Sequence, residues 1–382
     1  MKPIPLFKVH IPPEADLAVL ETLRSGHITQ GPMVETFEQQ LGRILKNPKI
    51  LALNSCTSAI QLALHLSGVG VGDEVITTPM TCAATNMPIL AAGAKPIWAD
   101  VDPATGLINP DSVEERVTGK SQAIICVDWG GQPCDLEPLR WIADKHNLWL
   151  IEDAAHALGA TYIEKPVGNG EWADFTCFSF QAIKHITTMD GGLLACKEDE
   201  TYKRGKLLRW YGIDRETPSS DNRIDIDPQE WGYKFHMNDV AASLGIAQLP
   251  HLHQILQKHQ YNHDWLRAHL PKGVSVLHQV SDRVSADWLC TVLLPNSNLR
   301  QEFKGFMVVR GVEVSQVHIR NDRLTAFRAF QDDYPLLGVD KFSERMICLP
   351  VHWALTKGDL EYVAKTVEEF VVAVGMSSPQ PA

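Results

Sequence analysis

The chain has 382 residues, of which 45% are hydrophobic and 21% are charged. This composition provides enough apolar surface for a large core and argues against intrinsic disorder, except in the tail at 377–382, which we expect to be frayed. The formal net charge of -11 disfavours polyanionic partners such as nucleic acid or an anionic membrane surface.

The start of the chain indicates a cytoplasmic protein. Glu14 and Asp16 come before any apolar stretch of signal-peptide length, and no run reaches the ~18 uncharged apolar residues that a membrane span needs.

The eight cysteines form no CxxC pair, which argues against a zinc site or any other metal site. Several lie in apolar runs, as buried reduced thiols do.

Seven short apolar segments in the first half of the chain predict β-strands at 50–55, 74–79, 95–101, 123–128, 148–153, 175–180 and 191–196. Helical patterns separate several of them, for example SAIQLALHLSGV (58–69) and DLEPLRWIADKHN (135–147). Strands with few polar positions that alternate with helices predict an α/β fold with a mostly parallel sheet covered on both faces.

The pattern changes after about residue 240. A helical run at 240–270 precedes shorter strand-like segments, VSVLH (274–278), LCTVLLP (289–295) and MICLPV (346–351). We therefore predict a large domain at 1–248, which includes the N-terminal segment, and a smaller α+β domain at 249–382.

Polar residues follow three of the predicted strands. Asn54-Ser55-Cys56-Thr57 follows the first strand, Asp128 the fourth and Asp153 the fifth. Ligands of a parallel sheet bind beyond the carboxyl ends of its strands, so this edge is the predicted site.

The segment FSFQAIKHITTMDGGLLAC (178–196) contains the strongest candidate for chemistry, Lys184. A lone lysine after a strand is usually a solvated loop residue. Here Ser179 and two threonines offer hydroxyl groups to an anion, and Gly191 and Gly192 permit close approach of the backbone. A lysine in such a partly desolvated pocket has a pKa below the usual ~10.4 and can form an imine with an aldehyde.

Two further segments complete the predicted site. In IEDAAHALGA (151–160) a strand ends at Asp153 and a helix is expected to follow, so Asp153 is either a helix cap or a carboxylate that keeps a pyridine nitrogen protonated. Ser55, Cys56 and Thr57 lie at a predicted helix N-terminus, which is either an ordinary cap or a phosphate cradle. An imine-forming lysine, a ring-nitrogen acid and a phosphate cradle together predict a site for pyridoxal phosphate (PLP).

The chain resembles the DegT/DnrJ/EryC1/StrS family, the sugar aminotransferases of PLP fold type I. The resemblance runs from GHITQGPMVETFE (26–38) to about residue 355, and includes EDAAHALGA (152–160), FSFQAIKHITTMDGG (178–192), RWYGIDRE (209–216) and GYKFHMNDVAASLG (232–245). It implies an aspartate-aminotransferase-like fold and a homodimer with active sites at the subunit interface.

The resemblance also implies roles for individual residues. Lys184 would hold the cofactor as a Schiff base and transfer protons, and Asp153 would pair with the pyridinium. The other residues implied in cofactor binding are Ser55, Cys56, Thr57, Cys82, His156, Ser179 and, from the neighbouring subunit, Lys234. Substrate contacts are expected from Thr29, Arg209, Arg215, His318 and Arg320; for the arginines and His318, an ordinary surface or domain-interface position is the alternative. Cys82 departs from the family, because an aromatic side chain usually stacks on the cofactor ring at this position.

The expected reaction moves an amino group from glutamate to a keto-deoxy sugar, expected to be linked to a nucleotide, by a ping-pong mechanism. The stretch VHIRND (317–322) departs from the commoner family form and keeps an unactivated keto sugar such as an octulosonate as an alternative. Dehydration on the same scaffold and a binding or regulatory role are further alternatives. One subgroup of the family carries histidine in place of the lysine and deoxygenates its substrate, so Lys184 favours transamination.

Overall fold

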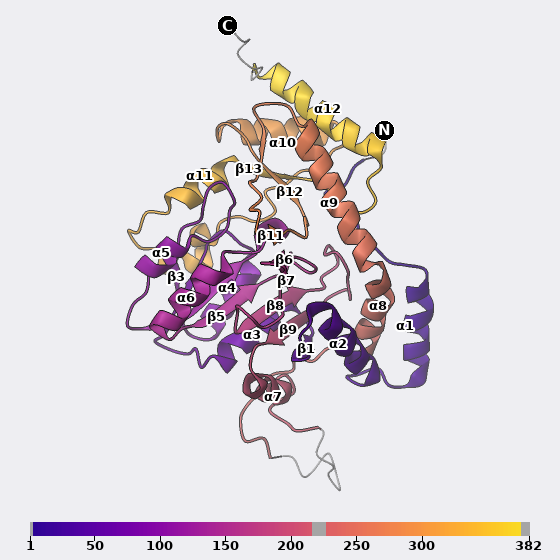
Figure 1. Ribbon diagram of the computed structural model, residues 1–382, viewed down its shortest axis with the longest axis vertical. Helices are drawn as coiled ribbons and strands as arrows, with labels where there is room; N and C mark the ends of the chain where they lie inside the picture. The colour runs from indigo at the N-terminus through magenta and orange to yellow at the C-terminus, as the bar shows by residue number, and fades with distance from the viewer. Residues whose placement is uncertain (1–2, 216–226, 376–382) are drawn as a thin grey trace.

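The computed structural model of the protein describes residues 3–215 and 227–375 (Figure 1). The predicted frayed tail at 377–382 lies outside these residues. Among them, no helix is long and apolar enough to span a membrane.

A seven-stranded sheet forms the centre of the large lower part of the molecule (Figure 1). Its strands are β1 (Ile50–Leu53), β2 (Glu74–Thr77), β3 (Lys95–Trp98), β4 (Ser121–Val127), β5 (Trp149–Asp153), β8 (Phe175–Ser179) and β9 (Gly192–Cys196). They lie in the order β1-β9-β8-β5-β4-β2-β3, and only β9 runs antiparallel to its neighbours. The structure thus confirms the seven predicted strands and the mostly parallel α/β sheet.

Helices cover both faces of this sheet. On one face α2 (Pro32–Leu45), α6 (Leu136–His146) and α8 (Asp239–Gln248) bury apolar side chains, with Phe37 against Phe180 as one example. On the other face α3 (Cys56–Leu66), α4 (Ala83–Ala91) and α7 (Asp199–Leu208) pack on alternate strand residues such as Leu51 and Leu194. Two-sided burial explains why the strands contain so few polar positions. The remaining helices before β9 are α1 (Glu14–Ser25) and α5 (Pro110–Glu115).

The C-terminal part has a separate core. A three-stranded antiparallel sheet of β10 (Ser275–Val276), β12 (Cys290–Leu293) and β13 (Met346–Leu349) packs with α9 (Leu252–His269), α10 (Leu299–Val309) and α12 (Lys357–Ala373), and α11 (Leu337–Arg345) precedes β13. A short 3₁₀ turn, Leu249–His251, separates α8 from α9, and the predicted domain boundary at 248/249 falls there. A third small sheet of β6 (Thr161–Tyr162), β7 (Lys165–Pro166) and β11 (Arg283–Val284) joins the two parts.

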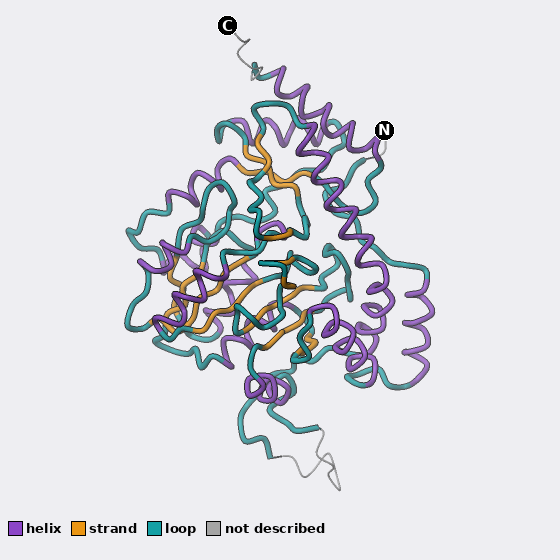
Figure 2. Tube along the Cα trace, in the orientation of Figure 1, coloured by secondary structure: helices purple, strands orange, loops and turns teal. Residues whose placement is uncertain are grey.

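The first described residues pack on the C-terminal part of the chain. Ile4 bridges to Val312, and the Leu6 N–H donates to the Glu313 carboxylate at 3.0 Å. The tube in Figure 2 shows this segment rising away from α1 to meet the upper, C-terminal part. In space, the N-terminal segment therefore joins the C-terminal core, although the sequence pattern predicts it as part of the large domain.

The helix predicted after Asp153 is wrong. Residues 154–160 form successive turns, with Ala157 N–H donating to Ala154 O and Ala160 N–H donating to Ala157 O. Gly159 has a φ of 88°, a left-handed conformation that ends any helical path. The small side chains of this segment instead fit between the sheet and α9.

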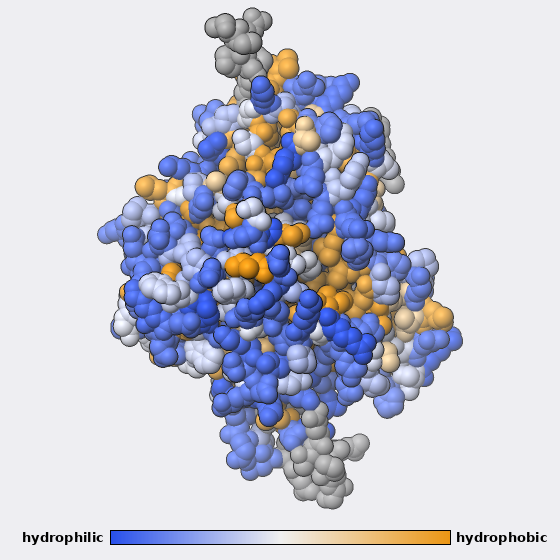
Figure 3. All heavy atoms as spheres, in the orientation of Figure 1, coloured by the Kyte–Doolittle hydropathy of each residue, from blue (hydrophilic) through white to orange (hydrophobic). Residues whose placement is uncertain are grey.

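Figure 3 shows a surface that is mostly hydrophilic, with apolar side chains gathered over α1 and α8. The exposed apolar side chains of α1 are Leu17, Leu20 and Leu23. These leucines form an apolar surface that the isolated chain leaves in water.

Gly192 allows β9 to approach the start of α3. A Cβ added at this position would lie 2.2 Å from the carbonyl carbon of Ser55 and 2.4 Å from the Cys56 nitrogen. We expect Gly192→Ala to lower the free energy of unfolding by roughly 1–3 kcal/mol, because backbone atoms have to move. Denaturant unfolding measures this change. At Gly119 an added Cβ meets nothing within 4 Å, so Gly119→Ala is the matched control. Equal midpoints for the two variants would contradict the expectation.

Candidate active site

A cavity of about 310 Å³ lies beyond the carboxyl ends of the central strands. Eight of the predicted cofactor residues line it: Ser55, Cys56, Thr57, Cys82, Asp153, His156, Ser179 and Lys184. His318, a predicted substrate residue, lines it as well. Segments far apart in the sequence therefore meet where the rule for parallel sheets places a ligand.

Lys184 lies in the loop between β8 and β9. Its backbone N–H donates to Gln181 O, and bonds from Phe180 N–H to Gly191 O and from Thr188 N–H to Phe180 O close the loop. Burial lowers the pKa of the Lys184 amine from 10.5 to about 8, although Asp153, Cys56 and Cys82 oppose this shift. At pH 8 about half of the amine is therefore neutral and nucleophilic, against less than ~1% for an ordinary lysine.

Asp153 ends β5 with both carboxyl oxygens hydrogen-bonded. Thr85 Oγ1 donates to one oxygen at 2.6 Å, and the Ala155 N–H donates to the other at 3.1 Å. Burial raises the pKa of Asp153, while these two bonds and the Lys184 amine act in the opposite direction. A bound cation, such as a protonated ring nitrogen, would further favour the ionised carboxylate.

The start of α3 supplies backbone N–H groups to the cavity. Ser55 is the N-cap residue, and its Oγ accepts a hydrogen bond from the Ser58 N–H at 3.0 Å. The capping role left open from the sequence is thus present. The first N–H groups of a helix have no acceptor within the helix, so those of Cys56 and Thr57, which line the cavity, suit an anion.

Two imidazole rings lie parallel in the cavity wall. The His156 and His318 ring centroids are 5.7 Å apart with an interplanar angle of 7°. Burial lowers the pKa of His318 to about 3 and that of His156 well below 6.5, and the nearby Lys184 lowers both further, so both rings are neutral near pH 7. His156 Nδ1 and His318 Nε2 are buried and have no hydrogen-bond partner within the described part of the chain. A bound molecule can satisfy both atoms.

Sequence reasoning missed Thr85 and Trp288. Thr85 lies one turn into α4, where a threonine has no distinguishing pattern, and becomes significant only through its bond to Asp153. Trp288 comes from the C-terminal part and lines the same cavity. A tryptophan before an apolar strand is typical of an ordinary core, so no signal in the sequence separates it from one.

Five predicted residues do not line this cavity within the described chain. Arg320 donates to Asp322 at 2.6 and 2.8 Å and also pairs with Asp340. Arg209 is 2% exposed and pairs with Glu38. Buried guanidinium groups require such partners, and these ion pairs match the alternative of a structural position for both arginines. Substrate contact by Arg209 and Arg320 stays a prediction.

Arg215 and Lys234 flank one indole ring outside the cavity. The Arg215 guanidinium carbon lies 4.2 Å and the Lys234 Nζ 3.8 Å from the Trp210 ring centroid. Thr29 also lies elsewhere, because its carbonyl accepts the Asp239 N–H at the start of α8. A contact from any of these three residues to a bound cofactor or substrate would have to be made in a neighbouring subunit.

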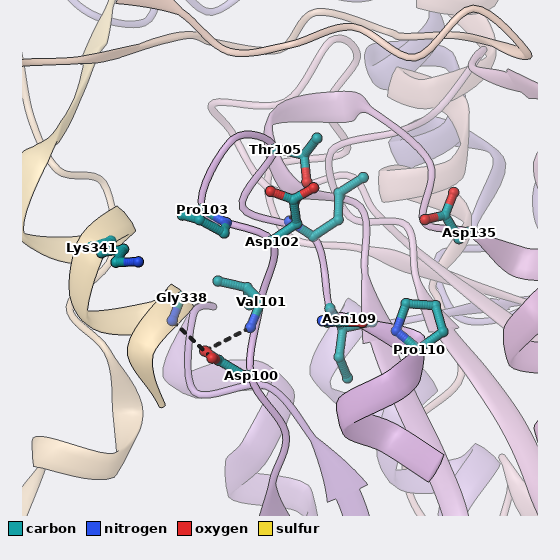
Figure 4. Close-up of a pocket in the computed structure, with 12 residues that line it drawn as sticks. Asp100, Val101, Asp102, Pro103, Thr105, Asn109, Pro110, Asp135, Gly338 and Lys341 are labelled. Atoms are coloured by element: carbon teal, nitrogen blue, oxygen red, sulfur yellow. Dashed lines mark hydrogen bonds between the residues drawn. The ribbon is translucent and has the colours of Figure 1, made fainter. Parts of the chain in front are cut away.

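A second cavity, of about 300 Å³, lies between the segment after β3 and the start of α11 (Figure 4). Asp100 accepts hydrogen bonds there from the N–H groups of Val101, Gly338 and Val339 at 2.7–2.9 Å. A Cβ added at Gly338 would lie 1.8 Å from Val101 O. The carboxylate of Asp100 thus attaches α11 to the large domain, and we assign this cavity to structure rather than to chemistry.

The fold and the first cavity define a class: a two-part α/β enzyme with a buried lysine and a buried acid at the carboxyl edge of its sheet. Residues 10–368 match the model of the DegT/DnrJ/EryC1/StrS aminotransferase family. The chain belongs to this family of PLP-dependent sugar aminotransferases.

Individual relatives agree with this assignment. An uncharacterized protein of Methanocaldococcus jannaschii is 33% identical over 96% of this chain and 97% of its own length. The sugar aminotransferase CalS13 of Micromonospora echinospora superposes with a TM-score of 0.90 at 33% identity, covering 96% of this chain and 99% of its own. Spr1654 of Streptococcus pneumoniae, solved in a PLP form, has a TM-score of 0.90 at 30% identity and covers 97% and 99% of the two chains.

The residues present fit PLP. The cavity is large enough for a small cofactor. It is lined by the Lys184 amine and the Asp153 carboxyl, which interact electrostatically, and by two imidazole nitrogens without partners, which offer polar contacts. The helix N-terminus and Ser179 suit a phosphate group.

In the cofactor-free protein, we expect Lys184 to be the most reactive lysine near pH 8. Its rate of imine formation with added PLP should rise with pH up to about 8 and then level off, because only the neutral amine attacks an aldehyde. Stopped-flow absorbance between pH 6 and 10 measures this profile. A rate that keeps rising towards pH 10.5 would show that the amine is not desolvated.

Proposed function

We propose that the enzyme transfers an amino group from glutamate to a keto-deoxy sugar linked to a nucleotide, in two half-reactions. The observation that carries this proposal is the Lys184 amine, whose pKa is about 8, in one cavity with the buried Asp153 carboxyl. An amine that changes protonation near physiological pH can take a proton from one atom and return it to another.

The cofactor supplies an electron-withdrawing ring that stabilises negative charge on the substrate carbon. Asp153 supports this chemistry because its carboxylate, fixed by Thr85 and Ala155, stabilises a proton on the ring nitrogen. Lys184, once its amine is free, moves the proton at the reacting carbon. The neutral His156 would help to hold the cofactor through its unpartnered Nδ1, and His318 would offer its unpartnered Nε2 to a substrate hydroxyl or carbonyl.

The cavity also indicates what the neighbouring subunit has to contribute. Apart from Lys184, no lysine or arginine of the described chain lines it, although a phosphate and the carboxylates of glutamate are anions. Lys234 and Arg215 lie together over Trp210. In the proposed homodimer Lys234 reaches the phosphate in the neighbouring site and Arg215 the substrate. The exposed leucines of α1 support association of subunits. The cytoplasmic location stays a prediction.

The first half-reaction gives a direct test. With glutamate and no acceptor, the loaded enzyme should release about one 2-oxoglutarate per subunit and then stop, because the second half-reaction needs the sugar. Lys184→Ala should lower this rate by ~10²–10⁴-fold, whereas the exposed Lys120→Ala should not change it. Release of ammonia instead of an amino sugar, with glutamate and the keto sugar both present, would indicate another PLP reaction, such as dehydration. Turnover with a free keto sugar and none with the nucleotide-linked one would contradict the proposed acceptor.

Mixing two inactive variants tests the contribution across the interface. Lys184→Ala and Lys234→Ala homodimers should each have little activity. Heterodimers formed by unfolding and refolding the mixture contain one site with both Lys184 and the neighbour's Lys234. An equal mixture should therefore recover about a quarter of wild-type activity. No recovery would show that Lys234 acts within its own subunit or not at all.

A further inference from the structure

Trp288 contacts both the reactive amine and the loop that carries it. Its side chain is 2% exposed, and its ring centroid lies 3.7 Å from Lys184 Nζ. Its Nε1–H donates to Ile183 O, the residue before Lys184, at 2.9 Å. The ring also stacks on His156 at 3.9 Å with an interplanar angle of 21°. A single side chain of the C-terminal part thus touches the amine, its loop and a cavity histidine.

The backbone that presents Trp288 is strained. Asp287 has a φ of 47°, an uncommon conformation for a residue with a side chain. Several bonds hold it there: the Ser285 hydroxyl accepts its N–H at 3.0 Å, and His259 Nδ1 hydrogen-bonds its carbonyl at 3.0 Å. Such strain persists only where the surrounding structure over-determines it, and it concentrates at functional sites.

Two glycines fit the turn closely against the large domain. Gly130 O accepts the Trp288 N–H at 2.8 Å, and Gly131 O accepts the Ala286 N–H at 3.0 Å. A Cβ added at Gly131 would lie 2.9 Å from the Asp287 nitrogen. The turn is therefore fixed from both parts of the molecule, and the indole has little freedom to move away from Lys184.

We propose that Trp288 is a positioning residue that receives the Lys184 amine on its indole face whenever the amine is not covalently engaged, and favours its ammonium form there. The negative face of an indole attracts a cation, and the attraction is strongest where water is excluded. In turnover, this contact keeps the released amine beside the reacting carbon and helps it hold the proton that it has taken. The inference rests on the proposed function in one respect, namely that Lys184 is the reacting amine.

Other charged and titratable groups also act on this amine. Asp153, Cys56 and Cys82 favour its protonated form, and burial opposes it. The histidines whose own pKa values are lowered by Lys184 are His156, His185 and His318, and all three are neutral near pH 7. The contribution of the indole therefore has to be measured as a difference between variants in which these groups stay the same.

The experiment measures the Lys184 pKa in the cofactor-free protein, from the pH dependence of reductive methylation followed by peptide mass spectrometry. Trp288→Leu keeps the site apolar but removes the aromatic face, so the pKa should fall by roughly one unit. Trp288→Phe keeps an aromatic face and should stay closer to wild type. The matched control is Trp98→Leu, since Trp98 is equally buried but packs on Phe327, away from the cavity. If Trp288→Leu does not fold, Trp288→Met takes its place.

The pKa measurement separates this inference from the proposed function, because it involves no turnover. An unchanged or raised Lys184 pKa in Trp288→Leu would overturn it, since hydration would then outweigh the indole. Equal decreases in the Leu and Phe variants would overturn it as well, because the bond to Ile183 and not the aromatic face would then be responsible. In the loaded enzyme, Trp288→Leu should lower kcat more than it changes the KM for glutamate, and a purely structural role would give no such difference.

Discussion

The desolvation of one amine is the constraint on which the rest of this structure depends. Burial lowers the pKa of Lys184 to about 8. The nearby Asp153 carboxyl offsets part of the free-energy cost of burying the charged form of the amine. The sheet achieves both, because β5 ends at Asp153 and β8 leads directly into the Lys184 loop beside it. β9, which runs antiparallel to its neighbours in the central sheet, returns from that loop against β1, where Gly192 allows the start of α3 to come close. The order and direction of these strands therefore fix the positions of Lys184, Asp153 and the N-terminus of α3.

The C-terminal part completes this site rather than serving as a separate module. His318 and Trp288 enter the cavity from segments that each begin with a left-handed residue, Val317 at a φ of 62° and Asp287 at 47°. Val317 is β-branched and seldom adopts such a φ, so the backbone is strained directly before His318, which lines the cavity. The large domain thus supplies Lys184 and Asp153 to the cavity, and the C-terminal part supplies the neutral His318 and the aromatic Trp288.

The sequence was sufficient for the parts of the site that depend on local patterns. Lys184, Asp153 and the 55–57 segment each follow a strand that the hydrophobic pattern predicts, and topology brings them together. Trp288 and Thr85 were not predictable, because their roles arise from contacts between distant segments; Trp288 bonds to a residue 105 positions away. The ion pairs of Arg209 and Arg320 were not predictable for a related reason, since nothing in their local sequence shows that Glu38, Asp322 and Asp340 pair with them. The helix expected after Asp153 gave way to turns because tertiary packing of small residues overrides helix propensity.

We propose that Lys184, and no other lysine, bonds covalently to the cofactor. Adding PLP to the purified protein, reducing with borohydride and mapping the modified peptides by mass spectrometry identifies the lysine directly. We expect one pyridoxyl group per chain, on the peptide that contains Lys184, and a visible absorption band that disappears on reduction. A colourless mixture, or a modification spread over surface lysines with Lys184 unmodified, would contradict it.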